Sequence, residues 1–328
     1  MALKPTIAGV LAGLTLLAAA CGDDDDNSSA TTEVSGTGTA ASAAGVTPPD
    51  TASADTGADG SASTVPGGEV PQRIVSLSPT GTEMLFAIGA GDQVVAVDDQ
   101  SDYPAEAAAV MTDLSGYTPN VEAIAGYEPD LVVVSSAGEL QAQLETLGID
   151  VWVGESAATF DAAYTQIEQL GAVTGHVGEA AELVGQMQTD IEAIIRSMPA
   201  MDAPLSVFHE LDDTGYSASS ATFIGQVYSA LGLRNIADAA EDISGYPQLN
   251  AETIIAANPD LIFLADTTCC NQSLETVAAR DGWDAIAAVA NGNVFAMDDD
   301  VASRWGPRVV DYMQQVRDAV EQALVPAG

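Results

Sequence analysis

The chain has 328 residues, with 48 acidic against 8 basic side chains and a formal net charge of −40. This length exceeds the roughly 250 to 300 residues at which single cores stop growing, so we expect about two domains. The charge repels nucleic acid and anionic lipid surfaces, which excludes a nucleic-acid-binding protein. We attribute the charge to solubility or a salt-adapted proteome, and not to an acidic binding function.

Residues 1–21 have the pattern of an export signal. Lys4 gives a positive start, residues 7–20 are apolar, and small residues precede Cys21. The apolar run is shorter than the ~20 residues that a membrane-spanning helix needs. The sequence "AAAC" resembles the lipobox of bacterial lipoproteins, although Ala18 stands where such boxes usually carry Leu. We therefore expect a lipid on Cys21, and the alternative is a plain secretory peptide with an incidental cysteine.

Residues 22–70 consist mainly of Asp, Ser, Thr, Ala, Gly and Pro, without an aromatic residue. Such a segment cannot bury enough apolar surface to offset the entropy lost on ordering. We predict a disordered acidic tether that holds a folded domain near a membrane.

Strand and helix patterns alternate in the next part of the chain, which we assign to an N-terminal α/β lobe, residues 71–160. The strands are continuous apolar runs, which favours a parallel sheet covered on both faces. We predict strands at residues 73–77, 94–97, 130–136 and 150–154, and helices at residues 82–91 and 139–148.

Residues 161–200 contain no strand pattern and are predicted to connect two lobes. Leu183, Met187, Ile191, Ile194 and Met198 recur at spacings of four, four, three and four. This period indicates one long helix, preceded by a shorter helix that ends near Gly175.

The alternation resumes in a C-terminal lobe, residues 201–328. We predict strands at residues 205–211, 260–266 and 292–299 and a helix within residues 221–233. A last helix carries one apolar face, formed by Val309, Tyr312, Met313, Val316 and Val320. The predicted fold class is therefore α/β, with two Rossmann-like lobes joined by one long α-helix and a ligand cleft between the lobes.

A short motif occurs once in each lobe, with an offset of 130 residues. Asn120, Glu122, Pro129, Asp130 and Leu131 recur as Asn250, Glu252, Pro259, Asp260 and Leu261. Each copy reads as a helix that begins near Asn, a Pro that ends it, and a strand led by Asp. We expect both glutamates to face solvent. The motif marks either the same joint in two related lobes or a matched pair of contact points.

Five segments resemble the substrate-binding proteins of bacterial ABC importers for vitamin B12 and ferric siderophores, the class with a rigid helical backbone between lobes. The segments are residues 73–91, 101–107, 120–134, 222–236 and 303–311. The resemblance implies an extracytoplasmic, lipid-anchored monomer that captures a small molecule and delivers it to the permease subunits, without catalysis, cofactor or bound metal. It also implies that Glu122 and Glu252 dock on permease arginines; the alternative is two capping or solvated glutamates.

The resemblance further assigns aromatic ligand contacts to four tyrosines. Tyr103 matches an aromatic position directly, Tyr246 matches by its spacing to Glu252, and Tyr117 and Tyr216 fall within about a residue of such positions. The alternative for each is an aromatic residue of the core or lobe edge.

In the segment "DDDVASRWGPR", Asp300 and Arg304 fall on an Asp and an Arg that reach toward the ligand in the vitamin B12 member of the family. Trp305 and Arg308 follow them, and we also expect Trp305 to contact the ligand, although it has no aromatic counterpart in that member. The alternative is an i,i+4 surface pair before a helix that begins at Pro307.

The ligand we expect is a corrinoid, because a strongly anionic iron chelate needs a cationic cleft and this segment offers mainly Arg304 and Arg308 beside three aspartates. A neutral or cationic hydroxamate siderophore is the alternative, followed by haem. An extracellular hydrolase has little support, since the chain lacks G-x-S-x-G, H-E-x-x-H and a phosphate loop, and has only His176 and His209. Cys269 and Cys270 form either a disulfide between neighbours or two free thiols.

Overall fold

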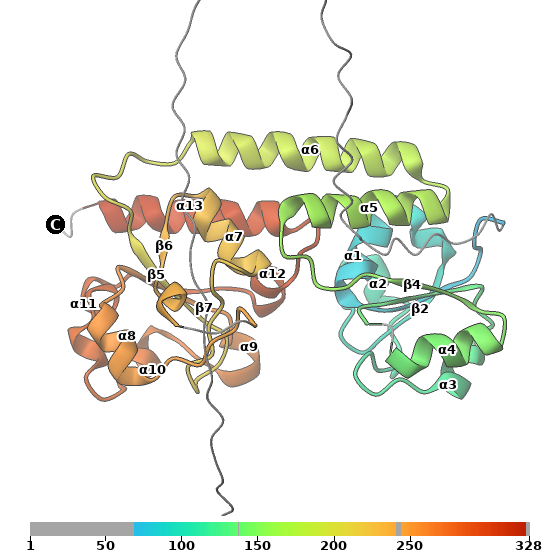
Figure 1. Ribbon diagram of the computed structural model, residues 1–328, viewed down its shortest axis with the longest axis horizontal. Helices are drawn as coiled ribbons and strands as arrows, with labels where there is room; N and C mark the ends of the chain where they lie inside the picture. The colour runs from blue at the N-terminus through green and yellow to red at the C-terminus, as the bar shows by residue number, and fades with distance from the viewer. Residues whose placement is uncertain (1–68, 137, 241–243, 326–328) are drawn as a thin grey trace, which may run out of the picture. The chain divides into compact units, whose positions relative to one another are not determined.

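Two parallel β-sheets, each of four strands, form the centre of the fold in a computed structural model that describes residues 69–136, 138–240 and 244–325 (Figure 1). The predicted signal peptide, Cys21 and the predicted tether up to residue 68 lie outside the described residues. All described residues belong to one compact unit of the chain.

The two sheets have the same topology. The first has the order β2-β1-β3-β4 and the second the order β6-β5-β7-β8. The strands of the first sheet are β1 (Ile74–Leu77), β2 (Val94–Val97), β3 (Leu131–Val134) and β4 (Asp150–Val153). Those of the second are β5 (Ser206–Glu210), β6 (Arg234–Asn235), β7 (Leu261–Leu264) and β8 (Val294–Ala296). The predicted α/β fold with two lobes is therefore confirmed.

Short helices follow the strands within each lobe. The N-terminal lobe contains α1 (Pro79–Ala87), the 3-10 helix η1 (Ala90–Gln93), α2 (Ala105–Ala108), α3 (Val121–Ala125) and α4 (Gly138–Thr146). The C-terminal lobe contains α7 (Phe223–Ala230), η2 (Ile236–Ala239), α8 (Ala251–Ala257), α9 (Thr267–Cys270), α10 (Leu274–Ala278), η3 (Trp283–Ala285), α11 (Ala287–Asn291) and α12 (Asp299–Ser303).

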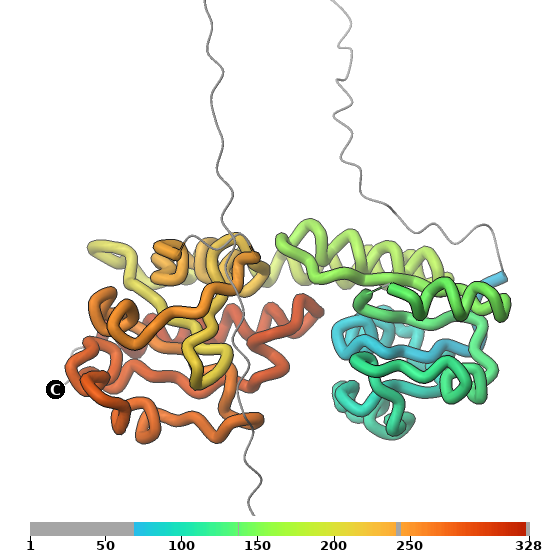
Figure 2. Tube along the Cα trace, turned by 60° about the horizontal axis from the view of Figure 1, so that its bottom comes forward, coloured from blue at the N-terminus to red at the C-terminus, as the bar shows by residue number. Residues whose placement is uncertain are grey.

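Three longer helices run past the sheets: α5 (Phe160–Thr174), α6 (Val177–Arg196) and α13 (Val309–Leu324). The helix α5 ends at Gly175, whose φ of 83° is left-handed and suits glycine. The apolar stripe of α6 is buried at Val184, Met187, Ile191 and Ile194. The helix packs against both α5 and α13, which lie along it in Figure 1; Figure 2 gives the turned view. The predicted long helix is thus present, although Met198 lies beyond its end.

One hydrophobic core extends through both lobes and these helices. It includes Leu85 of α1, Ile191 of α6, Val227 of α7 and Val316 of α13. A separate apolar cluster covers the opposite face of each sheet. The continuous apolar strands are explained by this arrangement, because each central strand is buried on both sides.

The repeated motif forms the same joint twice. Asn120 caps α3 by accepting a hydrogen bond from the Ala123 amide, and Asn250 caps α8 through the Thr253 amide. Asp130 and Asp260 then bind backbone N–H groups at, or just before, the start of a neighbouring strand. The Asp130 carboxylate accepts from the backbone N–H groups of residues 72 and 73, at 2.8 and 3.0 Å, and Asp260 accepts from the Ser206 amide at 2.7 Å.

Candidate functional site

The four predicted ligand tyrosines are all exposed aromatic side chains on loops. Tyr103 lies between β2 and α2, Tyr117 between α2 and α3, Tyr216 between β5 and α7, and Tyr246 just before α8. Tyr117 is 92% exposed, and the other three are between 40% and 45% exposed. In contrast, Tyr228 and Tyr312 lie in the core with almost no exposure.

Tyr216 and Tyr246 lie on adjacent loops of the C-terminal lobe. Tyr216 forms an antiparallel bridge with Gln248, the Ser217 amide donates to the Pro247 carbonyl at 2.9 Å, and the Ser219 amide donates to the Gly245 carbonyl at 2.8 Å. Partial burial raises the pKa of the Tyr246 hydroxyl above its ordinary value.

A buried acid on α1, Glu83, joins the two lobes through ion pairs. Its side chain is 2% exposed. Arg308 donates from Nη2 to Oε1 at 2.6 Å and from Nε to Oε2 at 3.0 Å, while Arg304 Nη1 donates to Oε1 at 2.8 Å. Both arginines belong to the segment between α12 and α13, so one carboxylate of the N-terminal lobe holds two cations of the C-terminal lobe.

Three predicted ligand residues meet around this carboxylate. Arg304 also pairs with Asp300 at 2.6 Å and donates to the Gln100 carbonyl at 3.1 Å. The Arg308 guanidinium lies over the Tyr103 ring, 4.3 Å from its centroid. We call Glu83, Tyr103, Asp300, Arg304 and Arg308 the junction cluster.

Glu83 is a residue that our sequence interpretation missed. One signal could have found it, because Glu83 is the single charged residue within the otherwise apolar and small helix sequence "PTGTEMLFA". An acid on a buried helix face requires a cation, and the chain offers only 8 basic residues.

Trp305 makes a contact that its predicted role did not include. Its indole Nε1 donates to Gln166 Oε1 on α5 at 2.9 Å, and its ring packs against the shared core. Through this contact Trp305 ties the segment after α12 to a connecting helix.

Two pockets lie beside predicted tyrosines. A pocket of about 710 Å³ is lined by the junction residues Glu83, Tyr103 and Arg308, together with apolar side chains such as Phe86 and the acids Asp92, Glu106 and Asp311. A pocket of about 310 Å³ lies at the carboxyl ends of β1 and β3 and is lined by Tyr117, Leu77 and Val134. In open α/β sheets, ligands bind at such strand ends.

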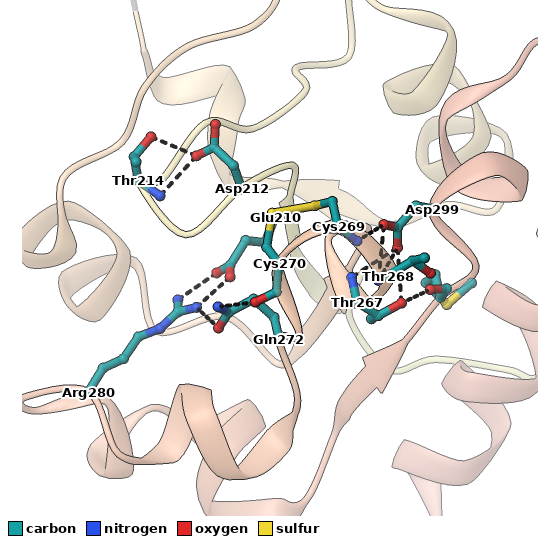
Figure 3. Close-up of a disulfide and its surroundings, with 11 residues drawn as sticks. Glu210, Asp212, Thr214, Thr267, Thr268, Cys269, Cys270, Gln272, Arg280 and Asp299 are labelled. Atoms are coloured by element: carbon teal, nitrogen blue, oxygen red, sulfur yellow. Dashed lines mark hydrogen bonds and ion pairs between the residues drawn. A yellow bond between two sulfur atoms is a disulfide. The ribbon is translucent and has the colours of Figure 1, made fainter. Parts of the chain in front are cut away.

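Cys269 and Cys270 form a disulfide at the end of α9, which decides between the two alternatives left open by the sequence (Figure 3). A buried ion pair lies beside it. The guanidinium of Arg280 forms two hydrogen bonds with the Glu210 carboxylate, at 2.7 and 2.5 Å, and a third with Gln272. Bidentate pairing of this kind supplies a buried carboxylate with hydrogen bonds and with an opposite charge in place of water.

Asp266, which directly precedes α9, is buried without such a partner. Neither of its carboxylate oxygens accepts a hydrogen bond of good geometry from the described residues. Burial raises the pKa of this carboxyl to about 7, and the neighbouring charge of Glu210 adds to the rise.

Glu122 and Glu252 occupy equivalent exposed positions. Each lies in the first turn of its helix, two residues after the capping asparagine. A carboxylate in the first turn is favourable beside the positive helix end, which accounts for the residue type but not for its presence in both lobes.

The described part of the chain lacks two features. None of its helices is long and apolar enough to cross a membrane. No group of three or more His, Cys, Asp or Glu side chains in residues 69–136, 138–240 and 244–325 could hold a metal ion.

Comparison with known proteins gives the family. Residues 74–301 match the periplasmic binding protein family. The chain belongs to this family. It is 32% identical over 259 residues to an ABC transporter substrate-binding lipoprotein of Bacillus subtilis, covering 76% of this chain and 80% of that one. It is 30% identical to a cobalamin-binding protein of Halobacterium salinarum, covering 78% and 71% of the two chains.

Solved structures of this family share the fold. The periplasmic vitamin B12-binding protein of Vibrio cholerae is 28% identical, with a TM-score of 0.64 over 78% of this chain and 99% of that one. A possible iron-binding protein of Staphylococcus epidermidis is also 28% identical, with a TM-score of 0.68 over 77% and 99% of the two chains. The chain is therefore a substrate-binding protein of an ABC importer, which binds a small molecule for delivery to a permease.

We predict that Glu83→Ala lowers the free energy of unfolding by about 3 to 5 kcal/mol, because it leaves Arg304 and Arg308 buried without their acid. Urea denaturation followed by circular dichroism measures this change. Glu192→Ala is the matched control, since Glu192 pairs with Arg196 on the surface, where both side chains are more than 65% exposed, and should cost under ~1 kcal/mol. Equal losses in the two variants would contradict the prediction.

Asp266 should make stability depend on pH. Its folded-state pKa of about 7 exceeds the ordinary value of 3.8, so its contribution is complete below about pH 4 and is lost as pH rises toward 7. The Asp266→Asn side chain cannot ionise. The urea midpoint of this variant should therefore rise relative to that of the wild type between pH 4.5 and pH 8. Asp284→Asn, at an exposed site, is the control. A difference that does not change with pH would show that Asp266 does not titrate in this range.

Proposed function

We propose that this chain is a lipid-anchored, extracytoplasmic binding protein that captures a corrinoid and delivers it to the permease of an ABC importer. The observation that carries this proposal is the junction cluster, where Tyr103, Asp300 and Arg304 meet at the seam of the two lobes. These are the positions that the family resemblance assigns to ligand contact. Relatives named for cobalamin or vitamin B12, at about 30% identity over three quarters of the chain, support it.

The charge of the junction cluster favours a neutral or cationic ligand. Two arginines face two carboxylates, Glu83 and Asp300, so the formal charges within the cluster cancel. The larger pocket beside it adds Asp92, Glu106 and Asp311. A strongly anionic catecholate or citrate chelate would have to displace an existing ion pair to bind one of the arginines, which costs free energy. A corrinoid requires mainly shape complementarity, aromatic stacking and hydrogen bonds.

A hydroxamate siderophore of neutral or cationic type is the second candidate. The zero net formal charge of the junction cluster also suits a neutral or cationic siderophore. A structural relative from Staphylococcus epidermidis is described as a possible iron-binding protein. A haem ligand is the third, and its support is confined to a shared fold with haem-binding proteins at 20% to 24% identity.

Anchoring through Cys21 rests on the "AAAC" sequence and on the Bacillus subtilis relative, which is named as a lipoprotein. A lipid at Cys21 and the tether after it would keep the binding domain near the permease. This raises the effective concentration of the binding domain at the permease. We propose a monomer as the working state.

Binding is tested with the full chain carrying Cys21→Ser, titrated with cyanocobalamin, cobinamide, ferrioxamine, ferric enterobactin and haem while its intrinsic fluorescence is followed. We expect saturable quenching by the two corrinoids. Tyr103→Ala should weaken cyanocobalamin binding about tenfold, because it removes an exposed stacking surface. Tyr127→Ala is the matched control, because this tyrosine lies outside the junction cluster and both pockets.

The outcomes separate the candidates. Binding of ferrioxamine alone would keep the receptor and replace the corrinoid by a hydroxamate siderophore. Equal affinities of the Tyr103 and Tyr127 variants would remove the junction cluster from the ligand site. A failure of all five compounds to bind would contradict the proposed ligand classes together.

Docking through Glu122 and Glu252 predicts a loss of transport without a loss of binding. In cells that contain the cognate permease, Glu122→Lys with Glu252→Lys should slow cyanocobalamin uptake several-fold, because rim charges act mainly on encounter and orientation. The affinity of the purified variant for cyanocobalamin should stay unchanged. Glu168→Lys on the exposed side of α5 serves as the control. Uptake at the wild-type rate would identify the two glutamates as solvated caps.

A further inference from the structure

The single-turn helix α9 connects the Cys269–Cys270 disulfide to the junction cluster. A turn of four residues is too short to be stable in water by itself, so its neighbours must hold it. Its amino end is bound by the carboxylate of Asp299, the first residue of α12. The Asp299 oxygens accept hydrogen bonds from the amides of Thr267, Thr268 and Cys269, at distances of 2.9 to 3.2 Å.

The other end of α9 is closed by the disulfide, which joins two successive residues in one covalent ring. The Cys270 amide donates to the Asp266 carbonyl at 3.2 Å, and Gln272, which accepts from Arg280, donates to the Cys270 carbonyl at 3.3 Å. Figure 3 shows the disulfide between the Asp299 carboxylate and the pair formed by Glu210 and Arg280. Both cysteines are exposed, so a reductant can reach them.

The contacts continue from α9 to the junction cluster without a gap. Asp299 is followed on α12 by Asp300, which pairs with Arg304, and Arg304 pairs with Glu83 in the N-terminal lobe. Asp299 is held in place by three amides whose direction depends on the α9 turn. A change in that turn therefore alters the support of Asp300 and Arg304.

We propose that the Cys269–Cys270 disulfide is a positioning element of the ligand site, which holds Asp300 and Arg304 through α9 and Asp299 so that ligand affinity depends on its oxidation state. This inference rests on the proposed function for the identity of the ligand site. A dithiol supplies the reducing step. The protein S–S bond breaks, the dithiol closes to its own cyclic disulfide, and its two hydrogens pass to the sulfur atoms of Cys269 and Cys270.

The test uses the full chain carrying Cys21→Ser, in which Cys269 and Cys270 are the only cysteines. Mass spectrometry after alkylation confirms complete reduction by dithiothreitol. We expect reduction to weaken cyanocobalamin binding about fivefold, a typical size for coupling between two sites, and reoxidation to restore it. Cys269→Ser with Cys270→Ser should match the reduced affinity and not respond to the reagent.

Trp305 gives a readout that needs no ligand. It directly follows Arg304 and donates to Gln166, while Trp152 and Trp283 are buried in the two lobes. The difference in emission between the chain and its Trp305→Phe variant isolates its signal. We expect this signal to shift to longer wavelength and become more accessible to acrylamide on reduction.

Asp299→Asn distinguishes positioning from general stabilisation. If the disulfide acts through Asp299, reduction of this variant should change its affinity by less than about twofold, whereas reduction of Asp284→Asn should still weaken binding about fivefold. Equal effects of reduction in the two variants would overturn the proposal, as would an unchanged Trp305 signal after complete reduction. A shifted Trp305 signal without cyanocobalamin binding in either state would support the positioning element and contradict the corrinoid ligand.

Discussion

The buried ion pairs of Glu83 with Arg304 and Arg308 impose a constraint on the whole structure. A carboxylate removed from water is tolerable only while its cations are present, and here both cations come from the segment that leads from the second lobe into α13. The position of α1 in the first lobe and the path of residues 304–308 are therefore fixed by the same atoms. The shared apolar core, which includes residues of α6 and α13, also holds the two lobes together, through many weaker contacts.

The way this chain uses its few arginines follows from that constraint. With 48 acidic residues, unpaired acids at the surface are plentiful and need no partner. A buried acid needs a cation to stay ionised, and Asp266, which forms no ion pair within the described residues, instead has a raised pKa. Glu83 and Glu210 are both fully buried, and together they engage Arg304, Arg308 and Arg280. A strongly acidic protein can thus keep a well-ordered interior with very few basic residues, provided that these are placed beside its buried acids.

The sequence was sufficient for features whose cause is local. The four-four-three-four spacing in α6, the Asn caps of α3 and α8, and the apolar runs of the strands each arise from neighbouring residues, and the elements were predicted from them. The contact of Arg304 with Glu83 spans 221 positions, and no local pattern pairs these residues. For the same reason the role of Trp305 on Gln166 was not predicted. The two cysteines allowed either state, because adjacency alone does not say whether the surrounding turn can hold a disulfide.

The core that both lobes share has a consequence for how such a receptor changes its ligand during evolution. Residues of α1, α6, α7 and α13 interlock in one cluster. Replacing a lobe by that of a relative would therefore replace half of a packed interior, and mismatched side-chain volumes there would destabilise the fold. Loops at the strand ends, such as those that carry Tyr103 and Tyr216, contribute little to that interior. New ligand specificity is therefore reached more readily by point changes in these loops than by recombination of whole lobes.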